Sequence, residues 1–344
     1  MLACTKNPYS PTMQENRSTG RFALPDRLRP TGGLVRRLAL LIVVFTVLVM
    51  VSGAIVRLTG SGLGCSDWPT CEEDQFVAAL DQPHAVMEFV NRLLSGVLGL
   101  PILLVVMATA LVRPFRRDLF AWSLALLVGV MCQVVLGAFV VKLKLTPVPV
   151  IGHFLLAVII LWAALVLHHR AAESTTTSSA RRELVVTSRV HALAWCCAAA
   201  ATFTVVAGTF VTGTGPHGGD TRASRLPFSI LAVVRVHGLA AWCTVALAVV
   251  TTWLLYRAGA PATVRRAATW VSGALLVQGA LGYLQYFNGV PPVLVGLHVF
   301  GATIVWITVV RLVLLCTVPA PARTASEQAA RWALDAPELE SVPS

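Results

Sequence analysis

Eight long apolar segments dominate this sequence and restrict what it can fold into. A helix that crosses the hydrocarbon core of a membrane needs about 20 consecutive, mostly apolar residues. Segments of that kind occupy residues 38–56, 84–112, 119–141, 148–167, 190–211, 230–256, 267–287 and 293–315. Because lipid offers no hydrogen bonds to the backbone, each segment must bond its own peptide groups as a helix. The sequence therefore predicts an all-α integral membrane protein with eight transmembrane helices.

The composition supports that prediction and excludes several classes of protein. Of the 344 residues, 56% are hydrophobic and 12% are charged, and the mean hydropathy is +0.75. Soluble globular proteins carry about 25% charged residues, so the chain is neither a water-soluble enzyme nor a disordered polypeptide. The net charge of +11 does not indicate a nucleic-acid partner, because Lys and Arg lie mainly between apolar runs, as in multi-pass membrane proteins.

The distribution of charge among the loops predicts the orientation in the membrane. Arginines gather in alternate connecting segments and near both termini, as Arg36, Arg37, Arg113, Arg116, Arg117, Arg170, Arg181, Arg182, Arg189, Arg257, Arg265, Arg266, Arg323 and Arg331. The first loop of the opposite side, residues 58–83, has no Lys or Arg and carries several carboxylates. The positive-inside rule then places both termini in the cytoplasm. We expect a bacterial plasma membrane, since residues 1–37 lack the amphipathic pattern of a mitochondrial transit peptide.

The two halves of the chain resemble each other. The stretch QVVLGAFVVKLKLTPVPVIGHFLLA from Gln133 matches QGALGYLQYFNGVPPVLVGLHVFGA from Gln278, and GAIVRLTGSG from Gly53 matches GTFVTGTG from Gly208. We therefore predict two four-helix repeats related by a pseudo-two-fold axis along the membrane normal. The expected segments are a disordered cytoplasmic tail (1–37), the first half (38–169), a cytoplasmic linker (170–189), the second half (190–316) and a second disordered cytoplasmic tail (317–344).

One apolar segment carries a stripe of polar side chains. His84, Glu88, Asn91 and Arg92 have the spacing of a single helix face, and Glu88 is the one acidic residue well inside an apolar segment. An ionisable group within a membrane helix is costly and indicates function. The alternative is an ion pair between Glu88 and Arg92 that only neutralises both charges.

Single histidines recur near the expected outer ends of three other segments, as His153, His237 and His298. Their similar depth favours ligands over three isolated core residues. Zinc requires three or four converging donors, whereas haem needs one or two axial histidines and an apolar slot between helices. We therefore predict that these histidines bind haem iron.

The first outer loop carries a pair of cysteines, Cys65 and Cys71, within GLGCSDWPTC. The outer side is oxidising, which favours a structural disulfide; a redox-active pair is the alternative. Arg57, Arg92 and Arg235 lie near the outer ends of helices, where a guanidinium group suits the carboxylate of a haem propionate. Lipid headgroups are the other partners expected for such arginines.

These residues together resemble the haem A synthase family, the membrane enzymes that supply haem A to terminal oxidases. The resemblance covers roughly residues 34–318 and rests on the cysteine pair, the E-x-x-N-R motif that ends at Arg92, and the three single histidines. It implies an oxidoreductase that converts the C8 methyl of haem O to a formyl group by successive hydroxylations. It also implies that His237 and His298 ligate haem b as cofactor, and that His153, Asn91 and Arg92 bind the substrate, haem O.

In that resemblance Glu88 is the catalytic residue, which accepts a proton or stabilises positive charge at the methyl carbon. The implied partners are haem O synthase, terminal oxidase assembly factors, an unidentified electron-transfer partner and the lipid bilayer. The chain departs from the family in two places. Asn91 stands where many members have His, so a single protein His is expected on the substrate iron. Residues 211–228 lack the second cysteine pair that some members carry.

Two other functions share part of this pattern. A di-haem electron carrier of the cytochrome b type would use the same histidines, but it requires no buried Glu and favours paired histidines in both halves. A transporter built on a parallel repeat would place its polar path at the membrane midplane. Pigment extraction separates the three as haem A or O with haem B, haem B alone, or no haem.

Overall fold

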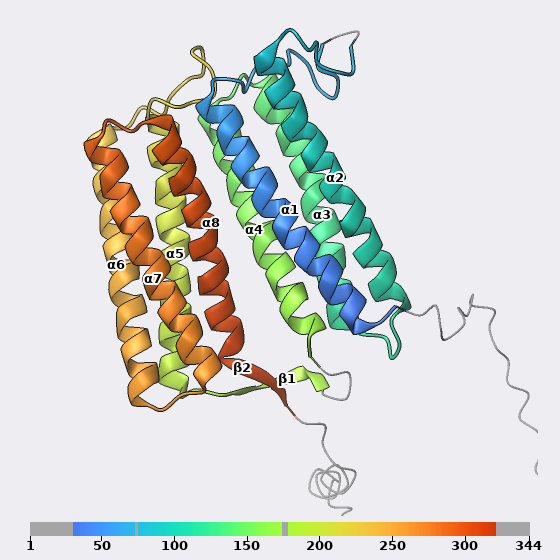
Figure 1. Ribbon diagram of the computed structural model, residues 1–344, viewed down its shortest axis with the longest axis vertical. Coiled ribbons are helices and arrows are strands. Elements are labelled where there is room, and N and C mark those ends of the chain that lie inside the picture. Colours follow the sequence, from blue (N-terminus) through green and yellow to red (C-terminus); the bar gives the residue numbers. More distant parts are fainter. Residues whose placement is uncertain (1–29, 73–74, 174–177, 321–344) are drawn as a thin grey trace, which may run out of the picture.

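The computed structural model describes residues 30–72, 75–173 and 178–320 (Figure 1). Within them the elements are α1 (Gly32–Leu58), α2 (Pro83–Leu111), α3 (Arg117–Lys142), α4 (Pro147–Ala171), β1 (Ser178–Leu184), α5 (Ser188–Thr214), α6 (Ile230–Arg257), α7 (Ala262–Phe287), α8 (Pro292–Leu315) and β2 (Thr317–Ala320). All eight helices are long and apolar enough to cross a membrane. The prediction of an all-α membrane protein with eight transmembrane helices is confirmed.

The helices begin and end close to the expected apolar segments, and polar or proline residues set their ends. The hydroxyl of Thr31 accepts a hydrogen bond from the N–H of Leu34 and caps α1. Residues 32–37, expected in a disordered tail, are therefore the first turns of a helix, while residues 1–29 lie outside the described part. Proline opens α2, α4 and α8, where a missing N–H costs no intrahelical bond.

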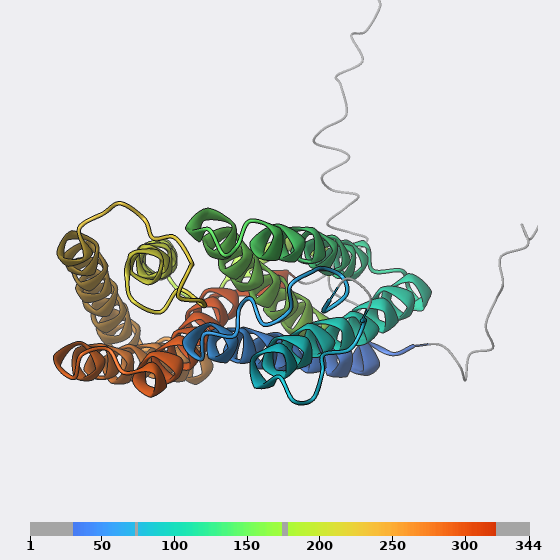
Figure 2. The same ribbon diagram turned by 90° about the horizontal axis from the view of Figure 1, so that it is seen from above.

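The helices form two groups of four, α1–α4 and α5–α8, that lie side by side in Figure 1 and in Figure 2. Each group encloses its own buried apolar core. Between the groups, α1 and α4 contact α8, and α4 also contacts α5. The indole N–H of Trp306 on α8 crosses this interface and donates to the carbonyl oxygen of Val158 on α4, at 3.2 Å.

The outward faces of the helices are apolar. Large side chains such as Leu100, Met107, Trp270 and Val277 are exposed. Extended apolar surface of this kind marks contact with a membrane or a partner, and on eight helices of spanning length it indicates lipid. The protein is therefore a multi-pass membrane protein.

The two ends of the bundle differ, and we call them the disulfide end and the sheet end. The disulfide end carries the loop between α1 and α2. At the sheet end β1 and β2 pair antiparallel, with Leu184 opposite Thr317. The guanidinium of Arg182 supports the pairing, because it donates to Thr317 Oγ1 at 2.9 Å and to Glu173 at 2.8 Å.

Neither strand is predicted by the sequence pattern. Residues 178–184 were expected to lie in the linker and residues 317–320 in a disordered tail, but their backbone groups satisfy one another in a ladder. The remainder of both segments, 174–177 and 321–344, lies outside the described residues. The two strands tie the connection between the two helix groups to the end of α8.

Candidate functional site

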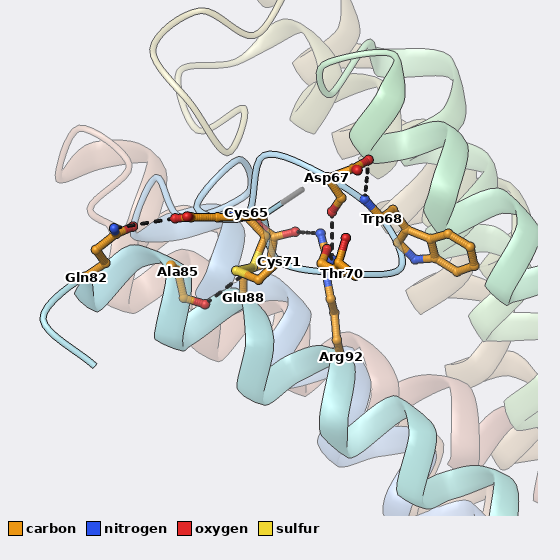
Figure 3. The surroundings of a disulfide bond; sticks show 10 residues. Cys65, Asp67, Trp68, Thr70, Cys71, Gln82, Ala85, Glu88 and Arg92 are labelled. Carbon is orange, nitrogen blue, oxygen red and sulfur yellow. Dashed lines mark hydrogen bonds and ion pairs between the residues drawn. A yellow bond between two sulfur atoms is a disulfide. The ribbon is translucent and has the colours of Figure 1, made fainter. Parts of the chain in front are cut away.

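The loop between α1 and α2 is closed by a disulfide between Cys65 and Cys71, both of them buried (Figure 3). The loop runs very close to the start of α2. A Cβ on Gly64 would lie 2.4 Å from the carbonyl group of His84, so glycine is needed at this point of contact. The predicted disulfide is therefore present, and it is packed on the helix that carries Glu88.

Glu88 and Arg92 hold this loop onto α2. Glu88 Oε2 accepts a hydrogen bond from the backbone N–H of Cys65 at 2.9 Å, and Oε1 forms an ion pair with Arg92 one helical turn away. Arg92 Nη1 donates to the carbonyl oxygens of Asp67 and Thr70, both at 2.9 Å (Figure 3). Glu88 is only 5% exposed. The ion pair considered as an alternative thus exists, within a wider clasp formed by Glu88, Arg92 and the disulfide loop.

Asn91 points to α1 and makes no part of that clasp. Its side-chain oxygen lies 2.7 Å from Ser52 Oγ, which is itself 3.1 Å from the carbonyl oxygen of Val49. The amide lies over Gly53, where a Cβ would be 3.8 Å from Oδ1 and 4.0 Å from Nδ2. Asn91 is therefore anchored to α1 by a hydrogen bond and by close contact with a glycine.

His153 on α4 is held by α3. Gln133 Nε2 donates to the carbonyl oxygen of His153 at 3.0 Å. The imidazole lies against Gly137, where a Cβ would be 3.5 Å from Cε1. His153 Nδ1 and Gln133 Oε1 are buried without a hydrogen-bond partner among the described residues. Buried polar atoms are almost always satisfied in native proteins, so this position is incomplete without a further group.

His237 on α6 and His298 on α8 face each other. Their ring centroids are 6.3 Å apart, with an angle of 71° between the ring planes. His237 Nδ1 lies 3.0 Å from the carbonyl oxygen of Thr204. A carbonyl can only accept, so in the neutral ring Nδ1 carries the proton and Nε2 is free to bind a metal. The carbonyl oxygen of His298 accepts from Gln278 Nε2 at 2.8 Å.

A glycine on the neighbouring helix lies against each of the three rings. The distances from a Cβ on the glycine to the ring Cε1 are 3.5 Å for Gly137 and His153, 3.1 Å for Gly208 and His237, and 3.3 Å for Gly282 and His298. Sequence reasoning missed these glycines, although the internal repeat contained the signal, since Gly137 and Gly282 occupy matching positions. At His237 and His298 a Cβ on the glycine would be closer than ordinary contact and would press on the ring, whereas at His153 it would be at van der Waals distance.

Two of the three arginines expected near haem propionates, Arg57 and Arg235, have different surroundings. Arg57 Nη1 donates to the carbonyl oxygen of His217 at 2.9 Å, and the N–H of Gly62 donates to the carbonyl oxygen of Gly219 at 2.9 Å. These bonds join the loop after α1 to the loop between α5 and α6, a link that the sequence did not predict. Arg235 is exposed on α6 and has no hydrogen bond or ion pair with any described residue.

The structure brings two sets of the predicted site residues together, whereas Asn91, His153, Arg57 and Arg235 belong to neither set. Cys65, Cys71, Glu88 and Arg92 are in contact within the first helix group, whereas His237 and His298 form a pair in the second. Within the described ranges, no three His, Cys, Asp or Glu side chains converge as a metal-ion site. The arrangement therefore suits a ligand that needs opposed single histidines better than a compact zinc centre.

Comparison with known proteins gives concordant matches. The profile of a family described as cytochrome oxidase assembly protein matches residues 36–216. The Heme A synthase of Shewanella oneidensis is 32% identical over 128 residues, which are 33% of this chain and 38% of that protein. The Heme A synthase of Oceanobacillus iheyensis is 30% identical over 114 residues, 32% of this chain and 36% of that protein.

A shorter match links the chain to a different haem-modifying protein. The Protoheme IX farnesyltransferase of Thermus thermophilus is 40% identical over 63 residues, which are 18% of this chain and 10% of that protein. The matched part of this chain spans less than two fifths of the length of either Heme A synthase. The similarity to those two relatives is therefore partial, while the family profile covers more than half of the chain.

Proposed function

The chain belongs to the cytochrome oxidase assembly protein family, and from this membership we propose that it is a haem A synthase. It oxidises the C8 methyl of haem O to a formyl group by successive hydroxylations, with loss of water. The observation that carries the proposal is the opposed pair of histidines in the second helix group. The clasped, buried Glu88 in the first group adds an ionisable side chain that a simple electron carrier does not require.

The spacing of His237 and His298 fits two axial ligands on one metal. A metal–imidazole bond is about 2 Å long and the ring centre lies about 1 Å behind the ligating nitrogen, so two axial rings have centroids about 6 Å apart. The observed separation is 6.3 Å. We therefore assign these residues as the ligands of haem b, which supplies electron transfer when bound.

The first helix group is the proposed site of the substrate, haem O. His153 ligates its iron, since its ring lies against a glycine and its buried Nδ1 has no hydrogen-bond partner among the described residues. Glu88 accepts a proton or stabilises positive charge near the reacting methyl. Arg92 supports this role, because it holds the disulfide loop over Glu88 and so keeps water from the carboxylate.

Two arginines are proposed to bind propionates. Arg235 lies two residues before His237 in sequence, and its exposed guanidinium has no partner among the described residues, so it can bind a carboxylate through two parallel hydrogen bonds. Arg57 uses one nitrogen for the carbonyl oxygen of His217 and keeps further donors for a second acceptor.

We infer that the protein lies in a bacterial plasma membrane, with the disulfide end outside and both termini in the cytoplasm. The acidic first loop and the arginines beside the sheet end support this orientation, and a disulfide persists in an oxidising compartment. The reaction that supplies haem O is a farnesyl transfer to haem, a chemistry named by the Thermus thermophilus relative. Terminal oxidase assembly consumes the product.

A di-haem electron carrier is the alternative function. It would use the His237–His298 pair equally well, but it favours a second pair of that kind. Among the described residues of the first helix group, no two histidine rings face each other. The structure thus supports one bis-histidine site and one site of a different composition.

Purification from cells that make haem O tests the proposal. The wild-type protein should contain low-spin haem b together with haem O or haem A, identified by chromatography and mass. His237→Ala and His298→Ala should each remove most of the low-spin haem b. His168→Ala is the matched control, because this helical histidine lies at the sheet end, where Nδ1 contacts the carbonyl oxygen of Arg36 at 3.1 Å. Unchanged reduced spectra in both variants would refute the assignment.

A further inference from the structure

Asn91 in the first helix group has the surroundings that His237 has in the second. Each side chain extends from the second helix of its group onto a glycine of the first helix, Gly53 for Asn91 and Gly208 for His237. These glycines occupy matching positions in the repeated stretches of sequence. The same part of each helix pair is therefore occupied by an amide in one group and by an imidazole in the other.

The two helix groups are also similar in the contacts made one helical turn before each of these glycines. His237 Nδ1 contacts the carbonyl oxygen of Thr204, four residues before its glycine. The corresponding carbonyl oxygen is that of Val49, and it lies 3.1 Å from Ser52 Oγ, which binds the side chain of Asn91 at 2.7 Å. A serine hydroxyl thus bridges the distance that the larger imidazole spans alone.

The other side of each site, formed by His153 in the first helix group and His298 in the second, is also similar. His153 and His298 each have a carbonyl oxygen bound by a glutamine amide and a ring packed on a glycine of the neighbouring helix. His298 faces His237. If the first helix group follows the same arrangement, the residue that corresponds to His237 opposite His153 is Asn91.

We propose that haem O bound at His153 keeps the other axial position of its iron open, on the side of Asn91, for a small ligand such as dioxygen, water or carbon monoxide. The inference rests on the proposed function, because it requires haem O in the first helix group. Asparagine is not among the side chains that serve as axial haem ligands. Its amide is also held by a hydrogen bond from the hydroxyl of Ser52.

Two other potential ligands on α2 are already engaged elsewhere. His84 Nδ1 lies 2.8 Å from Ser61 Oγ, and the same hydroxyl lies 3.6 Å from the sulfur of Met87. His84 is exposed at the start of α2, almost two turns from Asn91. Neither side chain occupies the place over Gly53.

The size and polarity of the position indicate what it accepts. An asparagine side chain has two fewer non-hydrogen atoms than a histidine. A position that holds an imidazole ring in the second helix group therefore leaves room beside Asn91 in the first group for a diatomic molecule or a water. The amide of Asn91 and the hydroxyl of Ser52 can both donate and accept hydrogen bonds. A small polar or polarisable ligand therefore fits better than a second protein side chain.

Carbon monoxide is the probe for this position. Full-length protein loaded with haem O is reduced, titrated with the gas and followed by absorption spectroscopy, together with its spin state. Wild type should be high-spin at haem O and bind one carbon monoxide per haem O, while haem b stays low-spin and inert. Asn91→His should make haem O low-spin and lower its affinity for carbon monoxide about tenfold or more, since an imidazole fills the position. Asn91→Ala, which keeps the position open, is the matched control and should bind the gas.

Each other outcome counts against the inference. Wild-type haem O that is low-spin and does not bind carbon monoxide overturns it, and if His84→Ala then restores binding, His84 is the axial ligand instead. Carbon monoxide binding that is unchanged in Asn91→His places the open position elsewhere and also overturns it. Failure of haem O to bind to the wild-type protein defeats the proposed function together with this inference, whereas bound but inert haem O defeats this inference alone.

Discussion

Replacement of Glu88 by glutamine separates a chemical role of this residue from its role in the clasp. Glutamine keeps the shape and one acceptor, so it can still bind the N–H of Cys65. The second oxygen, which pairs with Arg92, becomes an NH2 group that faces another donor. Arg92 retains its bonds to the carbonyl oxygens of Asp67 and Thr70, so its charge is not left without partners.

The cost of this change to stability follows from those contacts. One hydrogen bond between charged groups is lost, which is worth about 1.5–3 kcal/mol. Arg92→Gln has a larger effect, because it leaves the 5%-exposed carboxylate of Glu88 without its counter-charge, and a broken buried pair costs about 3–5 kcal/mol. If the only role of Glu88 were to hold the disulfide loop, Arg92→Gln would therefore impair turnover more than Glu88→Gln. If Glu88 assists the chemistry, Glu88→Gln should lower turnover by about 10²–10⁴-fold. This loss should be larger than the loss of turnover in Arg92→Gln.

The assay is the formation of haem A per haem b at saturating haem O, measured by chromatography, with heat-induced loss of the folded protein measured in parallel. Glu72→Gln is the charge control, because this carboxylate lies on the same loop outside the clasp. We expect Glu88→Gln to keep its haem b and to accumulate haem O or a partly oxidised haem. A turnover within about tenfold of wild type, or a smaller loss than that of Arg92→Gln, would show that Glu88 only holds the loop.

Three further predictions test other parts of the structure. Gly208→Ala places a Cβ 3.1 Å from a ring carbon of the proposed haem b ligand on α6 and should lower haem b content, whereas Gly238→Ala, with no atom within 4 Å, should not. Cys65 and Cys71 should resist alkylation until a reductant is added, and peptide mapping that finds both alkylated beforehand would contradict the disulfide. Trp306→Phe removes the hydrogen bond between the helix groups and should lower stability by about 0.5–1.5 kcal/mol; an unchanged melting temperature would show that the bond contributes nothing.

The features predicted correctly from sequence depend on local periodicity. The eight helices follow from the length of the apolar segments, because in lipid a helix is the only way to satisfy the backbone of a single span. The ion pair of Glu88 with Arg92, which the sequence analysis gives as the alternative to a functional carboxylate, follows from their four-residue spacing on one helix. The disulfide between Cys65 and Cys71 was predicted from the oxidising side on which their loop was placed.

The features that were missed depend on contacts between distant parts of the chain. The bond from the N–H of Cys65 to Glu88 requires the path of a loop that has no periodicity. The strands β1 and β2 pair across the entire second helix group, and neither has the alternating pattern that marks a strand. The glycine that contacts His298 is Gly282 on another helix, so the sequence around the histidine does not reveal it.

The sheet that joins β1 to β2 has a consequence for biosynthesis. Roughly 130 residues separate Leu184 from Thr317, so at about 5–20 residues per second the ribosome delivers the second strand roughly 7–26 s after the first. Throughout that interval β1 lacks the strand β2, and a charged side chain such as Arg182 on a strand edge hinders pairing with other chains. The ladder closes only after α8 has been made, so its formation marks a fully translated and inserted second helix group.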